Sequence, residues 1–355
     1  MKQVPIKPKR SQLHMLVIGL SALCAAMIVL PEFCAPLSLL LPLLACPLVG
    51  RREEPLVYVA SAMPAVASLM AGYDALYSVS LLSMGGFALL VTKLLPQKER
   101  VGSTGIMWYM LSVSMSLALI AASASKMLGG PLWEKLTEAI VDTLAGNERA
   151  GLLLYRFAAA GLISMPEGYV GNTLLLSVFE PVVVRQMLMS LKLMLGEVLF
   201  DLLPAFVVQS SMIVGLFTAL RVQRMNGVIL ILEAKTPAQQ KARVAVPPGF
   251  RLLMLPPRAR WPITLMAVGA LFLLSTASPV AQIVGQMCYS AFETTFMLLG
   301  AAVIVCVFSL KKPERKTLYG VLTAILYMIA PFLLFLIGLT DQTFHYRVKR
   351  SAHPD

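Results

Sequence analysis

The chain has few charged residues for its length. Asp, Glu, Lys and Arg make up 14% of the 355 residues, whereas hydrophobic residues make up 58%. A soluble globular chain carries about 25% charged and roughly 45–50% apolar residues, so this chain lacks the polar side chains that cover a water-facing surface. The mean hydropathy is +0.77. This composition excludes a soluble enzyme, a secreted disulfide scaffold and a disordered protein, and it indicates a polytopic membrane protein.

Residues that build metal centres and catalytic sites are also scarce. The chain has five cysteines and three histidines, without a C-x-x-C pair or metal-ligand spacing among them. It contains no Walker A loop, dinucleotide-binding fingerprint, HExxH pair or GxSxG elbow. We therefore expect no metal, no cofactor and no catalytic residues. An ATP-driven pump contained in this chain alone is excluded.

Positive charge is in excess, because 30 Lys and Arg against 18 Asp and Glu give a net charge of +12. Cytoplasmic loops of membrane proteins collect Lys and Arg, which explains the excess without a nucleic-acid partner. The largest asymmetry lies in residues 221–260, where eight basic residues stand against Glu233 alone. We predict that this segment is a cytoplasmic loop.

Nine apolar runs predict an all-α transmembrane bundle with eight or nine spans. They cover residues 14–30, 35–50, 55–72, 73–95, 104–125, 191–220, 261–283, 291–310 and 317–339. We interpret the first run as a retained helix with a cytoplasmic N-terminus rather than a signal peptide. The second run is short and holds three prolines, so we expect it to be kinked, partly extended or re-entrant. The side of the C-terminus and the oligomeric state stay open.

The predicted organisation has seven parts. They are a basic N-terminus (1–13), a five-helix membrane region (14–125), an amphipathic helical segment (126–190), a membrane helix (191–220), the basic loop (221–260), a three-helix membrane region (261–340) and a polar tail (341–355). Charges within 126–190 are nearly balanced, which is typical of a non-cytoplasmic segment. In this segment Pro131 opens and Gly146 closes a predicted amphipathic helix.

Ionisable side chains inside apolar runs are costly in a bilayer and mark candidate binding sites. Glu197 and Asp201 share one helical face just before Pro204, which suits a cation, a proton or a cationic solute. The alternative is that they lie near the outer interface and pair with Lys192. Glu293, at the start of the eighth run, is the third candidate, and its alternative is a solvated helix end.

Small residues mark a possible docking surface on the first run. Gly19, Ala22 and Ala26 share a strip about 60° wide on a helical wheel. Such a strip lets another helix approach closely in lipid. It packs either within its own bundle, which is the commoner use, or on a partner membrane subunit. Membrane lipids are the other partners that the composition implies.

Two short motifs resemble those of the YybS-like predicted membrane proteins, a bacterial family labelled as a domain of unknown function. The ending from Gly338 through Asp341 to Arg347 is similar to that family's closing pattern. The stretch that includes Pro256 and Trp261 resembles its approach to the last three helices. The resemblance implies a multi-pass protein of the bacterial cell membrane.

That family is in turn distantly similar to the substrate-binding subunits of energy-coupling factor transporters. In those subunits the first helix docks on a transmembrane coupling subunit that works with ATPases. The resemblance makes Gly19, Ala22 and Ala26 the matching docking positions. This chain is much longer than those subunits, by four further membrane or interfacial elements.

Two functions remain in competition. The first is a small-solute transporter or transport subunit, in which Glu197, Asp201 and Glu293 contact the solute. The second is a membrane scaffold without a transported substrate, whose basic loop binds another protein or anionic lipid. A water-accessible cavity at the face of Glu197 and Asp201 favours the first, and a packed bundle there favours the second.

Overall fold

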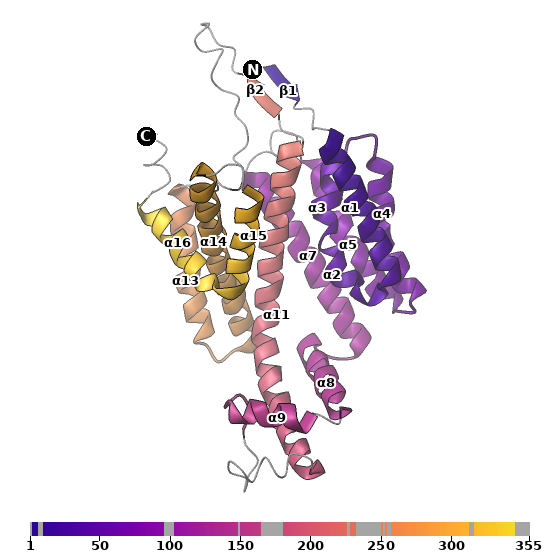
Figure 1. Cartoon of the computed structure of the whole chain (residues 1–355), viewed down its shortest axis with the longest axis vertical. Coiled ribbons are helices and arrows are strands. Elements are labelled where there is room, and N and C mark those ends of the chain that lie inside the picture. Colours follow the sequence, from indigo (N-terminus) through magenta and orange to yellow (C-terminus); the bar gives the residue numbers. More distant parts are fainter. Residues whose placement is uncertain are drawn as a thin grey trace. The chain divides into compact units, whose positions relative to one another are not determined.

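A computed structural model gives the architecture of most of the chain (Figure 1). It describes residues 2–5, 10–95, 103–147, 150–164, 180–225, 228–231, 250, 253, 257–311 and 316–344. The chain divides into two compact units, one formed by Met1–Ile120 with Val207–Asp355 and the other by Ala121–Phe206. The predicted all-α class is confirmed for the described residues, apart from one small ribbon.

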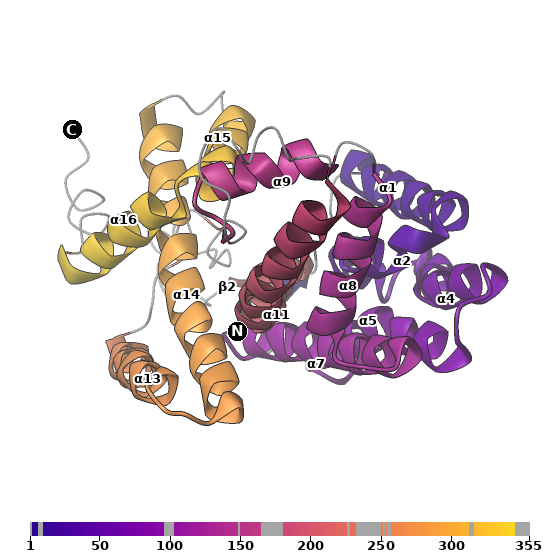
Figure 2. The ribbon, with the colours of Figure 1, turned by 90° about the horizontal axis from the view of Figure 1, so that it is seen from below.

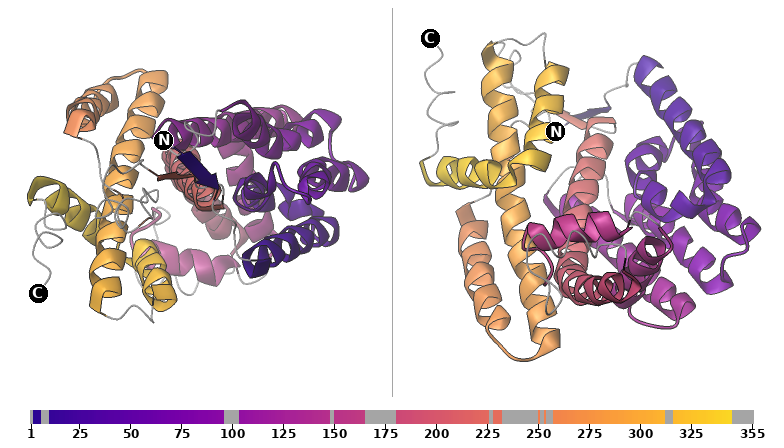
Figure 3. Two further views of the ribbon diagram at one scale, coloured as in Figure 1. Left: turned by 90° about the horizontal axis from the view of Figure 1, so that it is seen from above. Right: turned by 60° about the horizontal axis from the view of Figure 1, so that its bottom comes forward.

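That ribbon joins the N-terminal residues to the segment after the long helix α11 (Pro181–Met225). Strand β1 (Lys2–Pro5) pairs antiparallel with β2 (Val228–Ile231), so that Lys2 lies opposite Ile231 (Figure 3). The helical periodicity of the sequence gave no sign of this pairing, because two four-residue strands far apart in the chain carry little local pattern.

The first unit opens with helices of very different length. They are α1 (Arg10–Val29), η1 (Pro31–Phe33), α2 (Cys34–Ser38), α3 (Leu41–Ala45), η2 (Cys46–Leu48), α4 (Glu54–Met70), α5 (Ala75–Leu94) and α7 (Ser103–Leu128). Pro31, Pro42 and Pro47 each stand in the first turn of a short piece, where the missing N–H costs little. The second apolar run is therefore broken into short helical pieces, which fits the kinked form among the three predicted alternatives. The chain also bends by 118° between α1 and Pro31–Ser38.

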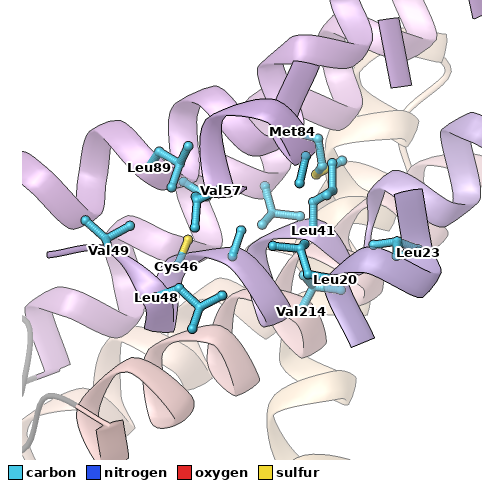
Figure 4. Packing of buried hydrophobic residues seen from close by; sticks show 14 of the residues in the cluster. Leu20, Leu23, Leu41, Cys46, Leu48, Val49, Val57, Met84, Leu89 and Val214 are labelled. Carbon is cyan, nitrogen blue, oxygen red and sulfur yellow. The ribbon is translucent and has the colours of Figure 1, made fainter. Parts of the chain in front are cut away.

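Aliphatic side chains from these pieces form the core of the first unit (Figure 4). Leu20, Leu41, Leu48 and Met84 are fully buried there, and Val214 of α11 joins them. In lipid, helices associate through close packing rather than through hydrophobic drive. The short helices between α1 and α4 thus fill the centre of a packed bundle.

A small charged cluster ties the start of α4 to the end of α5. The Glu54 carboxylate accepts hydrogen bonds from the Tyr58 hydroxyl at 2.6 Å and the Gly50 N–H at 3.0 Å, and it lies 3.0 Å from Lys93 Nζ. The Lys93 ammonium also lies 4.9 Å from the centre of the Tyr58 ring. The hydrogen bonds from Tyr58, Lys93 and Gly50 lower the pKa of Glu54 to about 2.

This cluster predicts a pH-dependent contribution to stability. Glu54 has a folded pKa of about 2, against about 4.3 in an unfolded chain. Its charge therefore stabilises the fold above pH 4, and that contribution disappears as the pH falls towards 2. We expect Glu54→Gln to lower the melting temperature at pH 7 and to have little effect near pH 2. An equal difference at both pH values would contradict the assignment.

The second unit contains α8 (Leu132–Ala145), α9 (Ala150–Ala159) and the first half of α11. The predicted amphipathic helix is confirmed as α8, with Pro131 at its N-cap and Gly146 at its C-cap. Buried side chains of α9 and α11, among them Leu154 and Met187, form the core of this unit.

The last helices of the first unit correct two predicted runs. They are α13 (Pro257–Leu274), α14 (Pro279–Lys311), α15 (Lys316–Ile329) and α16 (Pro331–Phe344). Helix α14 contacts the other three (Figure 2). The run predicted at 261–283 breaks before Pro279, and the run predicted at 317–339 breaks before Pro331 with a bend of 112°. Proline disfavours helical geometry in the residue before it and cannot donate to the preceding turn.

The prediction of eight or nine spans is not confirmed. Among the described residues, three helices are long and apolar enough to cross a membrane: Ala75–Leu94, Gly105–Leu128 and Val280–Phe308. The number rises to five if the bent pairs α1 with Pro31–Ser38 and α15 with α16 each count as one span. These helices are compatible with a membrane protein. Most of the predicted loop 221–260, and the tail beyond Phe344, lie outside the described residues.

Candidate functional site

Helices α14 and α16 cross at two glycines with almost no space between their backbones. A Cβ atom on Gly300 would collide with the Leu334 carbonyl oxygen, and a Cβ atom on Gly338 would collide with the Phe296 carbonyl oxygen. Any larger side chain at either position would therefore push the helices apart. This close approach explains why glycine is needed at Gly338, one of the positions of the predicted family motif.

Aromatic rings pack beside this crossing. The rings of Phe292, Phe296 and Phe335 lie with their centroids 5.0–5.8 Å apart in edge-to-face arrangements. Met297, Ala301 and Leu334 are buried next to them. The apolar side chains hold α14 and α16 together on this side, so a polar group nearby has few hydrogen-bond partners.

Several polar side chains are nevertheless buried within about one helical turn of the crossing or on the helix next to it. The Thr294 hydroxyl of α14, the Tyr327 hydroxyl of α15 and both amide atoms of Gln342 on α16 are buried without a hydrogen-bond partner among the described residues. Thr294 is 0% exposed and Gln342 is 5% exposed. A buried polar group left without a partner costs about 1–3 kcal/mol. Such groups need a partner that the described residues do not supply, such as water or a ligand.

Glu293 is the ionisable group of this region. It precedes Thr294 on α14, is half-buried, and is close enough to Tyr327 of α15 to act on it electrostatically. Among the described residues it has no ion-pair partner. The predicted alternative, a solvated helix end, does not fit a residue that lies fourteen positions inside α14.

We use the name buried polar cluster for Glu293, Thr294, Tyr327 and Gln342, which lie on α14, α15 and α16, with Glu293 close to Tyr327. A carboxylate, two hydroxyls and an amide offer oxygen acceptors together with neutral donors. This set suits a cation, a transferable proton or a small polar solute. It contains no pair of nucleophile and base, and no group of three or more potential metal ligands occurs among the described residues.

The predicted pair Glu197 and Asp201 lies elsewhere. Both are exposed residues of α11 in the second unit, whereas Glu293 belongs to the first unit. Lys192, the partner that the alternative interpretation expected for them, instead lies 3.3 Å from Glu138. The structure therefore does not describe one site that joins the three predicted carboxylates.

The small-residue strip of α1 lies beside the buried face of the helix, with its middle residue exposed and the other two half-buried. Leu16, Leu20 and the later large residues of the same helix take the buried face. Ala22 is exposed, Ala26 is half-buried, and a Cβ on Gly19 would lie 3.5 Å from Leu44, an ordinary contact distance. The middle of the strip is thus free to meet lipid or another protein.

This placement predicts the effect of a larger side chain at Ala22. We expect Ala22→Leu to leave the melting temperature of the purified protein unchanged, since no neighbour has to move. A bulkier residue at a packed position of the same helix, Leu20→Trp, should lower the melting temperature by several degrees. A marked loss of stability in the Ala22 variant would show that this face is packed after all.

The structure describes two of the four remaining family-motif positions, one exposed and one buried. Trp261 is 75% exposed at the start of α13, and Asp341 is 1% exposed and engaged in a polar interaction on α16. Pro256 and Arg347 lie outside the residues whose placement is described.

Sequence reasoning missed Thr294, Tyr327 and Gln342. One signal was present, because Ser290, Glu293 and Thr294 follow the i, i+3, i+4 spacing of one helical face inside an apolar run. No such pattern marks Tyr327 or Gln342, whose importance depends on the helices they meet. Comparison with protein-family models, with curated proteins and with solved structures finds no match. The resemblance to the YybS-like family therefore stays a prediction.

Proposed function

We propose that this chain is a membrane protein that binds and moves a small cationic or proton-carrying solute, and that the buried polar cluster contacts it. The observation that carries the proposal is the set of buried hydroxyl and amide groups on α14, α15 and α16 that have no hydrogen-bond partner among the described residues, with Glu293 next to Thr294 in the chain and close to Tyr327. Buried polar and ionisable groups in membrane helices commonly mark solute or proton pathways. Glu293 supplies the negative charge, and Tyr327, Thr294 and Gln342 supply hydrogen bonds.

The proposal also covers the membrane location, the number of crossings and the partner of the protein. A multi-pass protein of the bacterial cell membrane with eight or nine crossings would need several of the shorter or bent helices to cross as well. A role as a transport subunit that works with a transmembrane coupling subunit and ATPases is supported by the resemblance of the first helix. The exposed side chain of Ala22 leaves room for such a partner.

A membrane scaffold remains the second candidate. The eight-to-one excess of basic residues in 221–260 supports it, since such a loop attracts acidic proteins and anionic lipid. The two candidates differ in one respect that can be measured. A transporter needs a solute that stabilises the folded protein by binding to the buried polar cluster, and a scaffold does not.

A thermal-shift screen tests the proposal. The purified full-length protein is heated with monovalent cations, divalent cations and small amines at constant ionic strength. We expect one class to raise the melting temperature, and we expect Glu293→Gln to abolish the rise while the protein stays folded. The matched control is Glu197→Gln combined with Asp201→Asn, which should keep the rise because both carboxylates are exposed.

Two outcomes of the screen would overturn the proposal. If no class raises the melting temperature, the scaffold is favoured. If the exposed pair abolishes the rise and Glu293→Gln does not, the solute binds at the second unit instead.

A further inference from the structure

The second unit contains an open pocket with a mixed lining. Its volume is about 580 Å³, and it lies between α8, the start of α9 and α11. Most of its lining is apolar and includes Val141 of α8 and Val184 and Leu188 of α11. The polar exceptions are Asn147 and two basic residues of α11, Arg185 and Lys192. The pocket thus combines a mostly apolar lining with two positively charged side chains.

Arg185 and Lys192 are seven residues apart, so they lie on the same face of α11, about 10 Å apart along its axis. Arg185 is exposed and has no ion pair or hydrogen bond within the described part of the chain. An anion that entered between these side chains would be attracted by both positive charges.

Two basic residues and no acidic residue line the pocket, so its own lining carries positive charge. Glu138 of α8 lies 3.3 Å from Lys192 and 2.8 Å from Lys135, so one carboxylate serves two ammonium groups. Glu134 and Asp142, the other acids of α8, are exposed and do not line the pocket. Surface ion pairs of this kind are weak, so an entering anion can compete for Lys192.

The surroundings of the pocket distinguish a lipid from a free anion. Large apolar side chains on the same part of α11 are strongly exposed, with Val182 and Met189 at 68% and Leu193 at 67%. An apolar surface of this kind marks contact with lipid or another apolar partner. A free inorganic anion would gain nothing from these side chains or from the apolar lining.

We propose that this pocket binds an anionic phospholipid. The phosphate of the headgroup lies between Arg185 and Lys192, and the acyl chain follows Val184, Leu188 and Val141. The arginine fork is suited to phosphate oxygens, and the lysine adds a second positive charge. This site is independent of the buried polar cluster, which belongs to the other unit.

Lipid titration of the full-length protein in a neutral maltoside detergent tests the proposal. The probes are dioleoylphosphatidylglycerol, dioleoylphosphatidylcholine and inorganic phosphate, and the readout is the concentration that gives half of the maximal rise in melting temperature. We expect phosphatidylglycerol to act at the lowest concentration and phosphate to have no effect. Arg185→Gln combined with Lys192→Gln should weaken the phosphatidylglycerol response roughly tenfold.

Two single variants make the test specific. Arg156→Gln removes an exposed arginine of α9 that does not line the pocket, and it should leave the response unchanged. Glu138→Gln releases Lys192 from its carboxylate, and it should strengthen the response. Because Glu138→Gln adds no bulk, its response to phosphatidylglycerol tests the role of Lys192 even if the double variant folds poorly.

Three results would overturn the proposal. Equal responses to phosphatidylglycerol and phosphatidylcholine would show that charge is not recognised. A full response to phosphate would assign the pocket to a free anion. An equal loss in the Arg156 variant would show that only the net charge of the unit matters.

Discussion

Replacing Gly338 or Gly300 by alanine should lower the melting temperature by roughly 5 °C or more. One added methyl group collides with a backbone carbonyl oxygen of the other helix in each case. Backbone atoms cannot turn aside as a side chain does, so α14 and α16 must separate. Overpacking of this kind lowers the free energy of unfolding by about 1–3 kcal/mol. We expect a loss near the upper end of this range because the neighbouring atoms belong to the backbone. The measurement is the thermal unfolding of the purified protein.

Gly320 provides the matched control for these two variants. It lies on α15, and a Cβ atom there would meet nothing within 4 Å. Alanine is a better helix former than glycine by about 1 kcal/mol, so Gly320→Ala should leave stability unchanged or raise it slightly. If Gly338→Ala and Gly320→Ala had the same melting temperature, the close approach of the α14 and α16 backbones would be contradicted.

A cysteine at Thr294 should react with a small charged thiol reagent, although Thr294 is fully buried. The Thr294 hydroxyl has no hydrogen-bond partner among the described residues, so it needs water or a ligand. Our proposal requires a path to this position that is wide enough for a small solute. The variant is made in a background in which the five native cysteines are replaced. Threonine and cysteine are similar in size, so the substitution should be tolerated.

Met297→Cys is the comparison for this measurement. Met297 lies on α14 one turn further on, is 3% exposed and packs among apolar side chains. We expect the cysteine at 294 to react at least about tenfold faster than the cysteine at 297. Equal and slow reaction at both positions would mean a dry, packed crossing, and it would favour the scaffold.

Local features of the fold were predictable because they depend on neighbouring residues. Pro131 and Gly146 bound α8 at its N-cap and C-cap, each within one position of the place that proline and glycine prefer. The prolines at 36, 42 and 47 indicated the broken segment after α1. Proline also causes the helix breaks before Pro279 and Pro331. These breaks were not predicted because the apolar runs continue across both positions.

The buried polar cluster depends on contacts between helices, and a sequence pattern does not show these. Glu293 was found because a carboxylate in an apolar run stands out. Tyr327 and Gln342 look like ordinary residues until α15 and α16 are placed against α14. The same limitation explains Glu197, whose exposure depends on which face of α11 is packed.

The small-residue strip of α1 illustrates how packing decides between two uses of one pattern. A strip of small residues permits close approach, but the large aliphatic stripe of Leu16, Leu20 and Leu23 buries more area and takes the core. Ala22 is left on the outer face. The sequence showed both stripes and could not rank them.

The most direct test of the solute site is protection of the cysteine at position 294. The rate of its modification is measured with and without the solute that raises the melting temperature in the screen. Our account predicts that the solute slows modification several-fold, and that Glu293→Gln removes this protection. Modification at the same rate with and without the solute would contradict the proposal that the buried polar cluster binds it.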